Sequence, residues 1–296
     1  MNAIGALDRL EQILYGEMGP SVLRTLARFG RGDVPNEEES ANLPLIEELG
    51  LGRQTESEFE LTSLGYKCAD AAREYLFWLE RDRQVHGEDT IPLLALSNFR
   101  DTDVLELGAG WGCNVFRLHQ AGARARGREI EEVYVRFTRI IAKIEGITPP
   151  PIDLGSAEQL PYSDESFDWV LMFSALQFMD IPVAMREIVR VLRPGGTLIT
   201  TQPLLGVLLA DLWAKGRRGL AHRLVALGNS ISYGLMAKRV IGNVRGRSTA
   251  RPVYLTSRRL VRMTENAGLQ FQRELSGSKQ LAPGRDYLLV AKKVIT

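Results

Sequence analysis

The chain has 296 residues, 45% of them hydrophobic, and a formal net charge of +1 at pH 7. That composition is typical of a globular protein with a full core, and the near-zero charge excludes recruitment to nucleic acid or membranes by a global field. Two cysteines without metal-ligand spacing, an acidic N-terminus and the lack of any apolar run of about 18 residues exclude a disulfide framework, a secretory signal and a membrane span. We therefore expect a cytoplasmic protein of one large or two modest domains, without a metal site.

The first 95 residues are predicted to form a mainly helical domain. Apolar residues recur at helical intervals over residues 2–16, and further helices are expected over 21–29 and 37–49. A stretch of β character over 53–61 is followed by a long amphipathic helix that reaches about residue 83. The segments L-I-E-E-L-G-L-G and F-E-L-T-S-L-G-Y resemble the winged-helix fold, in which a helix, a short β wing and a second helix pack together.

This winged-helix-like domain is not expected to bind DNA. DNA-binding proteins of this kind place a basic helix in the major groove, and phosphate contacts need cations. The helix before the wing has no Lys or Arg and holds five glutamates: Glu37, Glu38, Glu39, Glu47 and Glu48. For the aromatic cluster of the long helix, Tyr75, Phe77 and Trp78, core packing is favoured over a dimer contact or a pocket wall.

Residues 104–114, V-L-E-L-G-A-G-W-G-C-N, are the most informative stretch. An apolar run predicts a buried strand, and the glycines allow a sharp turn against which a ligand can lie closely. A helix is expected over 112–121, with free first amides that suit an anion. A dinucleotide fingerprint would need glycine where the chain has Cys113. The chain instead has E-x-G-x-G-x-G, starting at Glu106. This pattern resembles motif I of the class I S-adenosylmethionine (SAM) dependent methyltransferases. The alternative is a glycine-rich turn of another doubly wound protein.

The next predicted strand, residues 123–130, ends in an acid. Glu129 follows Gly108 by 21 residues, and an acid at this place in an open α/β sheet accepts hydrogen bonds from ribose hydroxyls. The segment G-R-E-I at 127–130 is similar to the methyltransferase form of this site. The neighbouring acids Glu131 and Glu132 are expected to open the following helix, where carboxylates favour the positive dipole end.

Residues 155–170, G-S-A-E-Q-L-P-Y-S-D-E-S-F-D-W-V, resemble the adenine loop of the same family and the strand behind it. Ser156 stands where the family often has an Asp that binds the adenine amino group. A serine is expected to bind this group more weakly, so the backbone amide of Ala157 is expected to contribute more to adenine binding. Asp168 is left open between a role in the site and structural support at the start of the strand.

The remaining elements complete the pattern of an α/β protein. A fourth strand is expected over 170–174, a helix over 183–192 that R-P-G-G ends, and a fifth strand over 197–201. A helix over 256–267 and an antiparallel pair of strands near 271–275 and 287–291 follow. The chain is therefore identified as a class I SAM-dependent methyltransferase of the small-molecule type: a Rossmann-like seven-stranded sheet over 96–296, behind the helical domain of 1–95.

The resemblance implies SAM as cofactor, S-adenosylhomocysteine as product, and in-line transfer of the methyl group to a small organic molecule. It assigns the cofactor contacts to Glu106, Gly108, Ala109, Gly110, Gly112, Asn114, Glu129, Ile130, Ser156, Ala157, Glu158 and Ser174. Many O-methyltransferases carry a similar N-terminal module that dimerises and walls the substrate site, so a homodimer is expected. The alternative is a non-catalytic SAM-binding regulator or partner subunit.

An insertion at 203–252 is expected to form two or three amphipathic helices over the substrate mouth. It holds nine Lys or Arg residues against a single acid, Asp211. Three uses stay open: a lid with a solvated basic face, recognition of an acidic substrate, and peripheral contact with an anionic membrane carrying a quinone-like substrate. Nucleic acid is the least favoured partner because aromatic side chains for stacking are sparse there.

No motif places a catalytic group. If the acceptor is a hydroxyl, it needs a base, for which the weak candidates are His222, Tyr233 and Tyr254, with Gln177 as a positioning group. The acceptor atom itself is not predicted, and secondary metabolites, quinone-like molecules and acidic molecules all remain as substrate classes.

Overall fold

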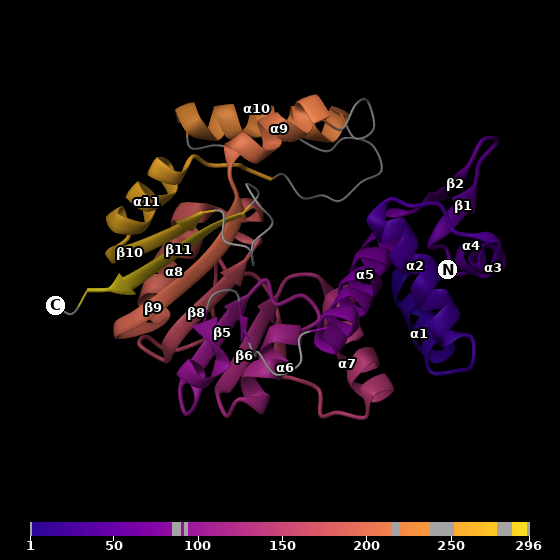
Figure 1. The fold of residues 1–296 in the computed structure, drawn as a ribbon, viewed down its shortest axis with the longest axis horizontal. Coiled ribbons are helices and arrows are strands. Elements are labelled where there is room, and N and C mark those ends of the chain that lie inside the picture. Colours follow the sequence, from indigo (N-terminus) through magenta and orange to yellow (C-terminus); the bar gives the residue numbers. More distant parts are fainter. Residues whose placement is uncertain are drawn as a thin grey trace.

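The computed structural model describes residues 2–84, 90–91, 94–214, 220–236, 252–276 and 286–294. Helices α1 to α5 gather on one side of the molecule, the sheet and its helices on the other, and two further helices lie above the sheet (Figure 1). None of the described helices is both long and apolar enough to cross a bilayer.

The N-terminal part follows the predicted order of helices, hairpin and long helix. Its elements are α1 (Ala3–Leu14), α2 (Gly19–Arg31), α3 (Glu37–Ser40), α4 (Leu43–Glu48), β1 (Gly52–Gln54), β2 (Phe59–Leu61) and α5 (Ser63–Gln84). Helices α2 and α5 pack closely, since a Cβ atom on Gly30 would lie 2.5 Å from the Ala69 carbonyl oxygen. This order is compatible with a winged-helix-like module, and that assignment stays a prediction.

The single helix predicted over 37–49 is wrong, because two short helices stand there. Pro44 occupies the first turn of α4, where a proline ring is tolerated, but inside a continuous helix it would meet the carbonyl of Ser40. The Asn42 side chain lies at the junction and donates to the hydroxyls of Ser21 and Thr25 at 2.8 and 2.9 Å. These bonds tie the break to α2.

The sheet has seven strands in the order β10-β11-β9-β8-β5-β6-β7, which confirms the predicted fold. The strands are β5 (Asp103–Leu107), β6 (Arg124–Glu129), β7 (Ile152–Leu154), β8 (Phe167–Phe173), β9 (Leu192–Pro203), β10 (Leu269–Ser276) and β11 (Asp286–Lys293). Strands β5 to β9 pair in parallel, and β11 is antiparallel to both of its neighbours. After β5 the chain adds β6 and β7 on one side of β5, and then β8 on the other side, so the strand order reverses next to β5. Ligands of such sheets bind at that switch point, beyond the carboxyl ends of the strands.

Helices cover both faces of the sheet. They are α6 (Cys113–Gln120), α7 (Glu132–Glu145), α8 (Ile181–Val191) and α11 (Ser257–Asn266). Alternate residues of β5 serve different cores: Leu105 and Leu107 pack with α8 and α11, whereas Val104 packs with α6. Two short 3-10 turns, η1 (Leu96–Phe99) and η2 (Leu176–Phe178), and the small hairpin of β3 (Thr90–Ile91) and β4 (Leu94–Ala95) complete this part.

Strand β9 starts five residues earlier than predicted, so the R-P-G-G segment belongs to the strand and not to a loop. Leu192 already pairs with Phe167, and the register then shifts. Arg193 reaches both Asp103 and Asp168, at 2.9 and 2.8 Å, and Asp168 also accepts the Asp103 amide at 2.8 Å. Asp168 therefore supports the amino ends of β5 and β8, at the edge opposite the ligand side.

The insertion forms α9 (Leu205–Ala214) and α10 (Leu220–Met236), which lie side by side above the sheet (Figure 1). Its two ends meet, because the Leu205 amide donates to the Leu255 carbonyl at 3.0 Å. Helix α9 is apolar on nearly every side, unlike the amphipathic helix that was expected. Of the nine predicted cations only Arg223 lies within the described residues, and it is buried. The other eight, and with them any basic face, lie outside the described residues.

Candidate functional site

The loop after β5 holds its shape through glycine. Gly108, Gly110 and Gly112 all have left-handed backbones, with φ of 67°, 56° and 90°. A Cβ atom on Gly108 would lie 2.5 Å from the Cβ atom of Ala175, so a larger residue does not fit there. The amides of Gly108 and Ala109 donate to the Arg128 carbonyl at 2.8 and 3.3 Å, which fastens the loop to β6. Helix α6 starts directly behind, with Gly112 as its cap.

Glu106 is a buried acid with an unused oxygen. Its side chain is 2% exposed, Asn114 donates to Oε1 at 2.7 Å, and Oε2 has no hydrogen-bond partner. Burial, partly opposed by the Asn114 bond and reinforced by the negative charges of Glu129 and Glu74, raises the pKa of this carboxyl to about 8. A buried polar atom without a partner is uncommon in native proteins and marks a place where a ligand can bind.

Glu129 connects the end of β6 to the glycine loop. Its Oε2 accepts the Gly110 amide and its Oε1 the Glu131 amide, both at 2.9 Å. A carboxylate has further lone pairs, so these two bonds leave room for ligand hydroxyls. Burial raises the pKa of Glu129 although three backbone amides oppose the shift. As predicted, Glu131 and Glu132 open α7.

Two exposed apolar side chains lie beside Glu129. Ile130 is 66% exposed, and Leu154, at the carboxyl end of β7, is 51% exposed. Exposed aliphatic groups at the ends of two neighbouring strands suit one face of a flat ring. Ile130 was among the predicted residues. Leu154 was missed, although it is the last residue before the predicted adenine loop.

The predicted adenine loop is held mainly by its own contacts. The Ser156 hydroxyl accepts the Glu158 amide at 3.0 Å, and the Ser156 carbonyl accepts from Arg128 at 3.3 Å. The Ala157 side chain is buried in the sheet core, and Glu158 accepts the Asp180 amide at 2.7 Å. Both the serine hydroxyl and the Glu158 carboxylate thus already stabilise the loop.

An N-terminal element, α5, also reaches the glycine loop, which the sequence analysis missed. A Cβ atom on Gly110 would lie 3.3 Å from Oε2 of Glu74. Burial raises the pKa of Glu74 to about 7, Arg73 lowers it, and the charges of Asp70 and Glu129 add to the rise. The signal in the sequence was an Asp and a Glu four residues apart, on one face of the long helix.

Aromatic rings hold α5 in this place. Trp111, inside the glycine loop, meets Trp78 edge to face at 5.3 Å between centroids and Tyr75 at 6.0 Å. All three rings are buried, so core packing, the favoured prediction, accounts for Tyr75 and Trp78. Phe77, predicted as part of the same cluster, instead is 62% exposed, because it lies on the outer side of α5.

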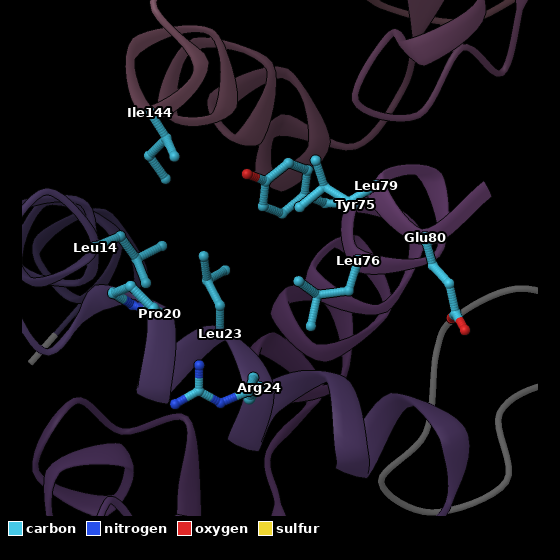
Figure 2. Close-up of a pocket in the computed structure, with 9 residues that line it drawn as sticks. All are labelled: Leu14, Pro20, Leu23, Arg24, Tyr75, Leu76, Leu79, Glu80 and Ile144. Atoms are coloured by element: carbon cyan, nitrogen blue, oxygen red, sulfur yellow. The ribbon is translucent and has the colours of Figure 1, made fainter. Parts of the chain in front are cut away.

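A hollow of about 630 Å³ lies behind this aromatic cluster, among α1, α2, α5 and α7 (Figure 2). It is lined by Leu14, Pro20, Leu23, Arg24, Tyr75, Leu76, Leu79, Glu80 and Ile144. None of these residues comes from the sheet, so the hollow is separate from the strand ends that carry the glycine loop. Within the described ranges, no three His, Cys, Asp or Glu side chains are grouped so that they could hold a metal ion.

Comparison with known proteins identifies the sheet. Residues 105–200 match the family model described as a methyltransferase domain. A SAM-dependent methyltransferase from Methanosarcina mazei has the same fold, with a TM-score of 0.50 and 18% identity over 67% of this chain and 96% of that one. The chain contains a class I SAM-dependent methyltransferase domain.

Two curated relatives match parts of this methyltransferase domain. The ubiquinone/menaquinone biosynthesis C-methyltransferase UbiE of Bartonella bacilliformis is 32% identical over 149 residues, 46% of this chain and 56% of that protein. The methyltransferase GfsG of Streptomyces halstedii is 36% identical over 98 residues, 32% of this chain and 35% of that protein. The chain thus spans about half or less of these relatives.

Two of the predicted catalytic candidates, Gln177 and Tyr254, belong to two segments that are joined through their backbones beyond the end of β8. Ser174 is exposed with a left-handed φ of 53°, and its amide donates to the Thr201 carbonyl at 2.8 Å. The backbone carbonyl of the buried Gln177 accepts the Val253 amide at 2.9 Å, so Tyr254 lies in the segment next to Gln177. Tyr233 is buried in a core cluster, and the side chain of His222 lies outside the described residues.

Proposed function

We propose that the chain binds SAM at the carboxyl ends of β5 and β6 and transfers its methyl group to a small, largely apolar organic molecule, with S-adenosylhomocysteine as product. The observation that carries the proposal is the orphaned Oε2 of Glu106 beneath the glycine loop. A buried carboxylate oxygen without a donor favours a ligand that brings a cation or an N–H group.

The residues present fit this cofactor part by part. Glu106 and the loop of Gly108 to Gly112 would hold the methionine part, where glycine leaves no Cβ atom in the way. Glu129 would accept the ribose hydroxyls, and Ile130 would cover the adenine together with Leu154. The amides of the adenine loop would bind the ring edge.

The main task of the chain in methyl transfer is to align the acceptor with the methyl group. When bound, the cofactor supplies an electrophilic methyl group on a sulfonium. The chain has to place an acceptor in line with that group and keep water away, and alignment alone supplies about 7–11 kcal/mol of barrier reduction. Gln177 and Tyr254 lie at the end of β8 and are the residues proposed to position the acceptor.

An apolar substrate is favoured by the helices above the site. Helix α9 has one charged residue, Asp211, and helix α10 only Arg223, which is buried. Leu209, Leu224 and Ile231 are exposed on these helices. The name of the UbiE relative, which refers to quinones, points to the same chemistry. A quinone-like or similarly lipophilic ring is therefore the proposed acceptor.

The helical part, residues 1–95, is proposed to wall the cofactor and substrate sites, and residues 96–296 to form the catalytic domain. The exposed Phe77 and Val34 are the side chains through which a homodimer would form. Light scattering of the purified chain measures this, and a monomer at all concentrations would refute the dimer.

The experiment for the function combines binding with labelling. Calorimetry measures the affinity for SAM, and methyl-labelled SAM is then incubated with the protein and a fractionated cell extract, alongside a panel of hydroxylated quinones and phenols. Label in the lipid or small-molecule fraction, absent with a Gly110→Arg control, supports the enzyme. Label in protein or nucleic acid would overturn the substrate class. Tight SAM binding without label in any fraction would favour a regulatory SAM-binding subunit.

A further inference from the structure

Four carboxyl groups from three different elements influence one another around the glycine loop. Glu106 is the last residue but one of β5, Glu129 ends β6, and Asp70 and Glu74 come from α5. The negative charge of Glu74 raises the pKa of Glu106, and the charges of Asp70 and Glu129 raise the pKa of Glu74. Each interaction therefore disfavours a further negative charge. Among the described residues, the charged or titratable groups that also face Glu74 are Arg73 and Tyr134.

One arginine does not balance these acids. Arg73 lies 3.3 Å from Asp70 and 3.7 Å from Glu74, and its side chain is 41% exposed. Glu106 and Glu129 have hydrogen-bond donors from an amide side chain and backbone amides, but no salt bridge to either of them is found within the described residues. The side chains of Asp70 and Glu74 are 47% and 44% exposed, so water screens their charges, whereas Glu106 and Glu129 are buried. Buried charges in proteins are normally paired, so these two carboxyl groups favour a cationic ligand.

An independent observation shows where the missing partner belongs. Oε2 of Glu106 is buried and has no partner, at the foot of the same loop. In the proposed function this place is taken by the methionine part of SAM, which carries an ammonium and a sulfonium.

The position of Glu74 follows from the way α5 is fastened. Lys67 pairs with Glu131 at 2.5 Å, just beyond β6. Positions 67, 70 and 74 follow at helical spacing i, i+3 and i+7, so they share one face of α5. With the Trp111 contacts described above, this face is pinned against the loop, and Glu74 is aimed at Gly110.

We propose that Glu74 of α5 is a specificity residue of the cofactor site, whose charge selects the cationic cofactor over its uncharged product. This inference rests on the proposed function. SAM carries a sulfonium, an ammonium and a carboxylate, and hence a net charge of +1. S-adenosylhomocysteine has lost the sulfonium charge and is neutral overall. A net negative site attracts the first and is indifferent to the second, which assists product release.

The raised pKa of Glu74, about 7, gives a second signature. Near pH 7 part of the Glu74 population is protonated in the ligand-free protein. A cation nearby favours the ionised form, so binding of SAM expels protons, whereas binding of the neutral product expels fewer.

The test is calorimetry of SAM and S-adenosylhomocysteine on the full chain at pH 7, in two buffers of different ionisation enthalpy. Glu74→Gln is expected to weaken SAM binding about tenfold and product binding by less than about threefold, and to reduce proton release. Glu74→Asp keeps the charge and is expected to keep most of the preference. Glu80→Gln removes the same charge from the rim of the hollow shown in Figure 2 and is expected to change neither affinity.

Each alternative result has a defined meaning. If Glu74→Gln leaves both affinities unchanged, or lowers both equally, the charge selection is refuted while the proposed function stands. If the wild-type chain binds neither ligand, the proposed function fails and this inference with it. Thermal unfolding of each variant verifies that it is folded.

Discussion

Gly110 illustrates how much a single position decides at this site. Its backbone is left-handed, its amide binds Glu129, and the place of its missing Cβ atom faces Glu74. The sequence pattern was sufficient to predict that Glu106, the glycines and Glu129 lie close together, because they are consecutive or follow a fixed strand spacing, and their role in cofactor binding stays a prediction. Asp70 and Glu74 were not predictable, since they reach the loop only through tertiary packing of a helix more than 30 residues away.

Gly110→Arg is expected to abolish SAM binding while leaving the protein folded. The left-handed backbone costs a non-glycine residue about 1–2 kcal/mol, but a guanidinium beside Glu74 supplies the cation that the acids lack. Calorimetry and thermal unfolding measure the two effects. Gly146→Arg is the matched control, because Gly146 has a φ of 66° with no atom near its Cβ position, and it should lower stability without affecting affinity. Wild-type affinity of Gly110→Arg would contradict the location of the site.

The stability of the ligand-free protein should fall as pH rises from about 5 to about 8. The pKa of Glu106 is raised to about 8 in the folded chain, above the usual 4.5, so folding favours its protonated form. That contribution is complete below the unfolded pKa and is lost as pH rises through the folded pKa. Glu106→Gln mimics the protonated group and should flatten the dependence of the melting temperature on pH. Equal slopes in the variant and the wild type would refute this account of Glu106.

At the scale of elements, the contact between α5 and the glycine loop joins the two parts of the chain. Trp111 supplies that contact from inside the motif itself. Strong local signals predicted α1, α6 and α11 closely, and the structure shows that the side chains of Asn2 and Thr256 cap α1 and α11. Prediction failed where tertiary contacts decided, as at the Asn42 junction and in β9, whose early start depends on pairing between Leu192 and Phe167.

Trp111→Ala is expected to destabilise the protein by about 3–5 kcal/mol, because it removes a large buried ring. It should also loosen α5, which hydrogen exchange detects as faster exchange over residues 63–84. Ile4→Ala changes an exposed side chain on α1, in the same group of helices, and should leave the exchange of α5 unchanged. If α5 exchanges at the wild-type rate in Trp111→Ala, the ring does not hold the helix.

At the scale of the whole molecule, the order of motifs along the chain was enough to predict the sheet. Parallel strands joined by helices leave few topologies, and the spacing of the motifs selected this one. The arrangement of the N-terminal helices was not predictable in this way. They share one apolar core with α7 and Trp111, which brings together residues far apart in sequence.

Removal of residues 1–90 should therefore yield an aggregating core and not an autonomous domain. The truncation would expose Trp111, Val133, Phe137 and Ile140, all now buried against the N-terminal helices. Size-exclusion chromatography measures the state of the truncated chain. A soluble fragment with wild-type affinity for SAM would show that the N-terminal helices are dispensable for both folding and cofactor binding.

The closed base of the insertion has an evolutionary consequence. Because Leu205 and Leu255 are joined by a hydrogen bond, the chain between them leaves and rejoins the domain at one place, and this cassette is held further by Tyr233, whose side chain is buried in the core and whose carbonyl accepts from Arg259. Each doubling of loop length costs only about 0.6 kcal/mol of closure entropy. Longer, shorter or differently charged cassettes can thus be grafted onto the same two residues. Under the proposed function, such a change would alter the acceptor that is methylated while the ends of β5 and β6 stay as they are.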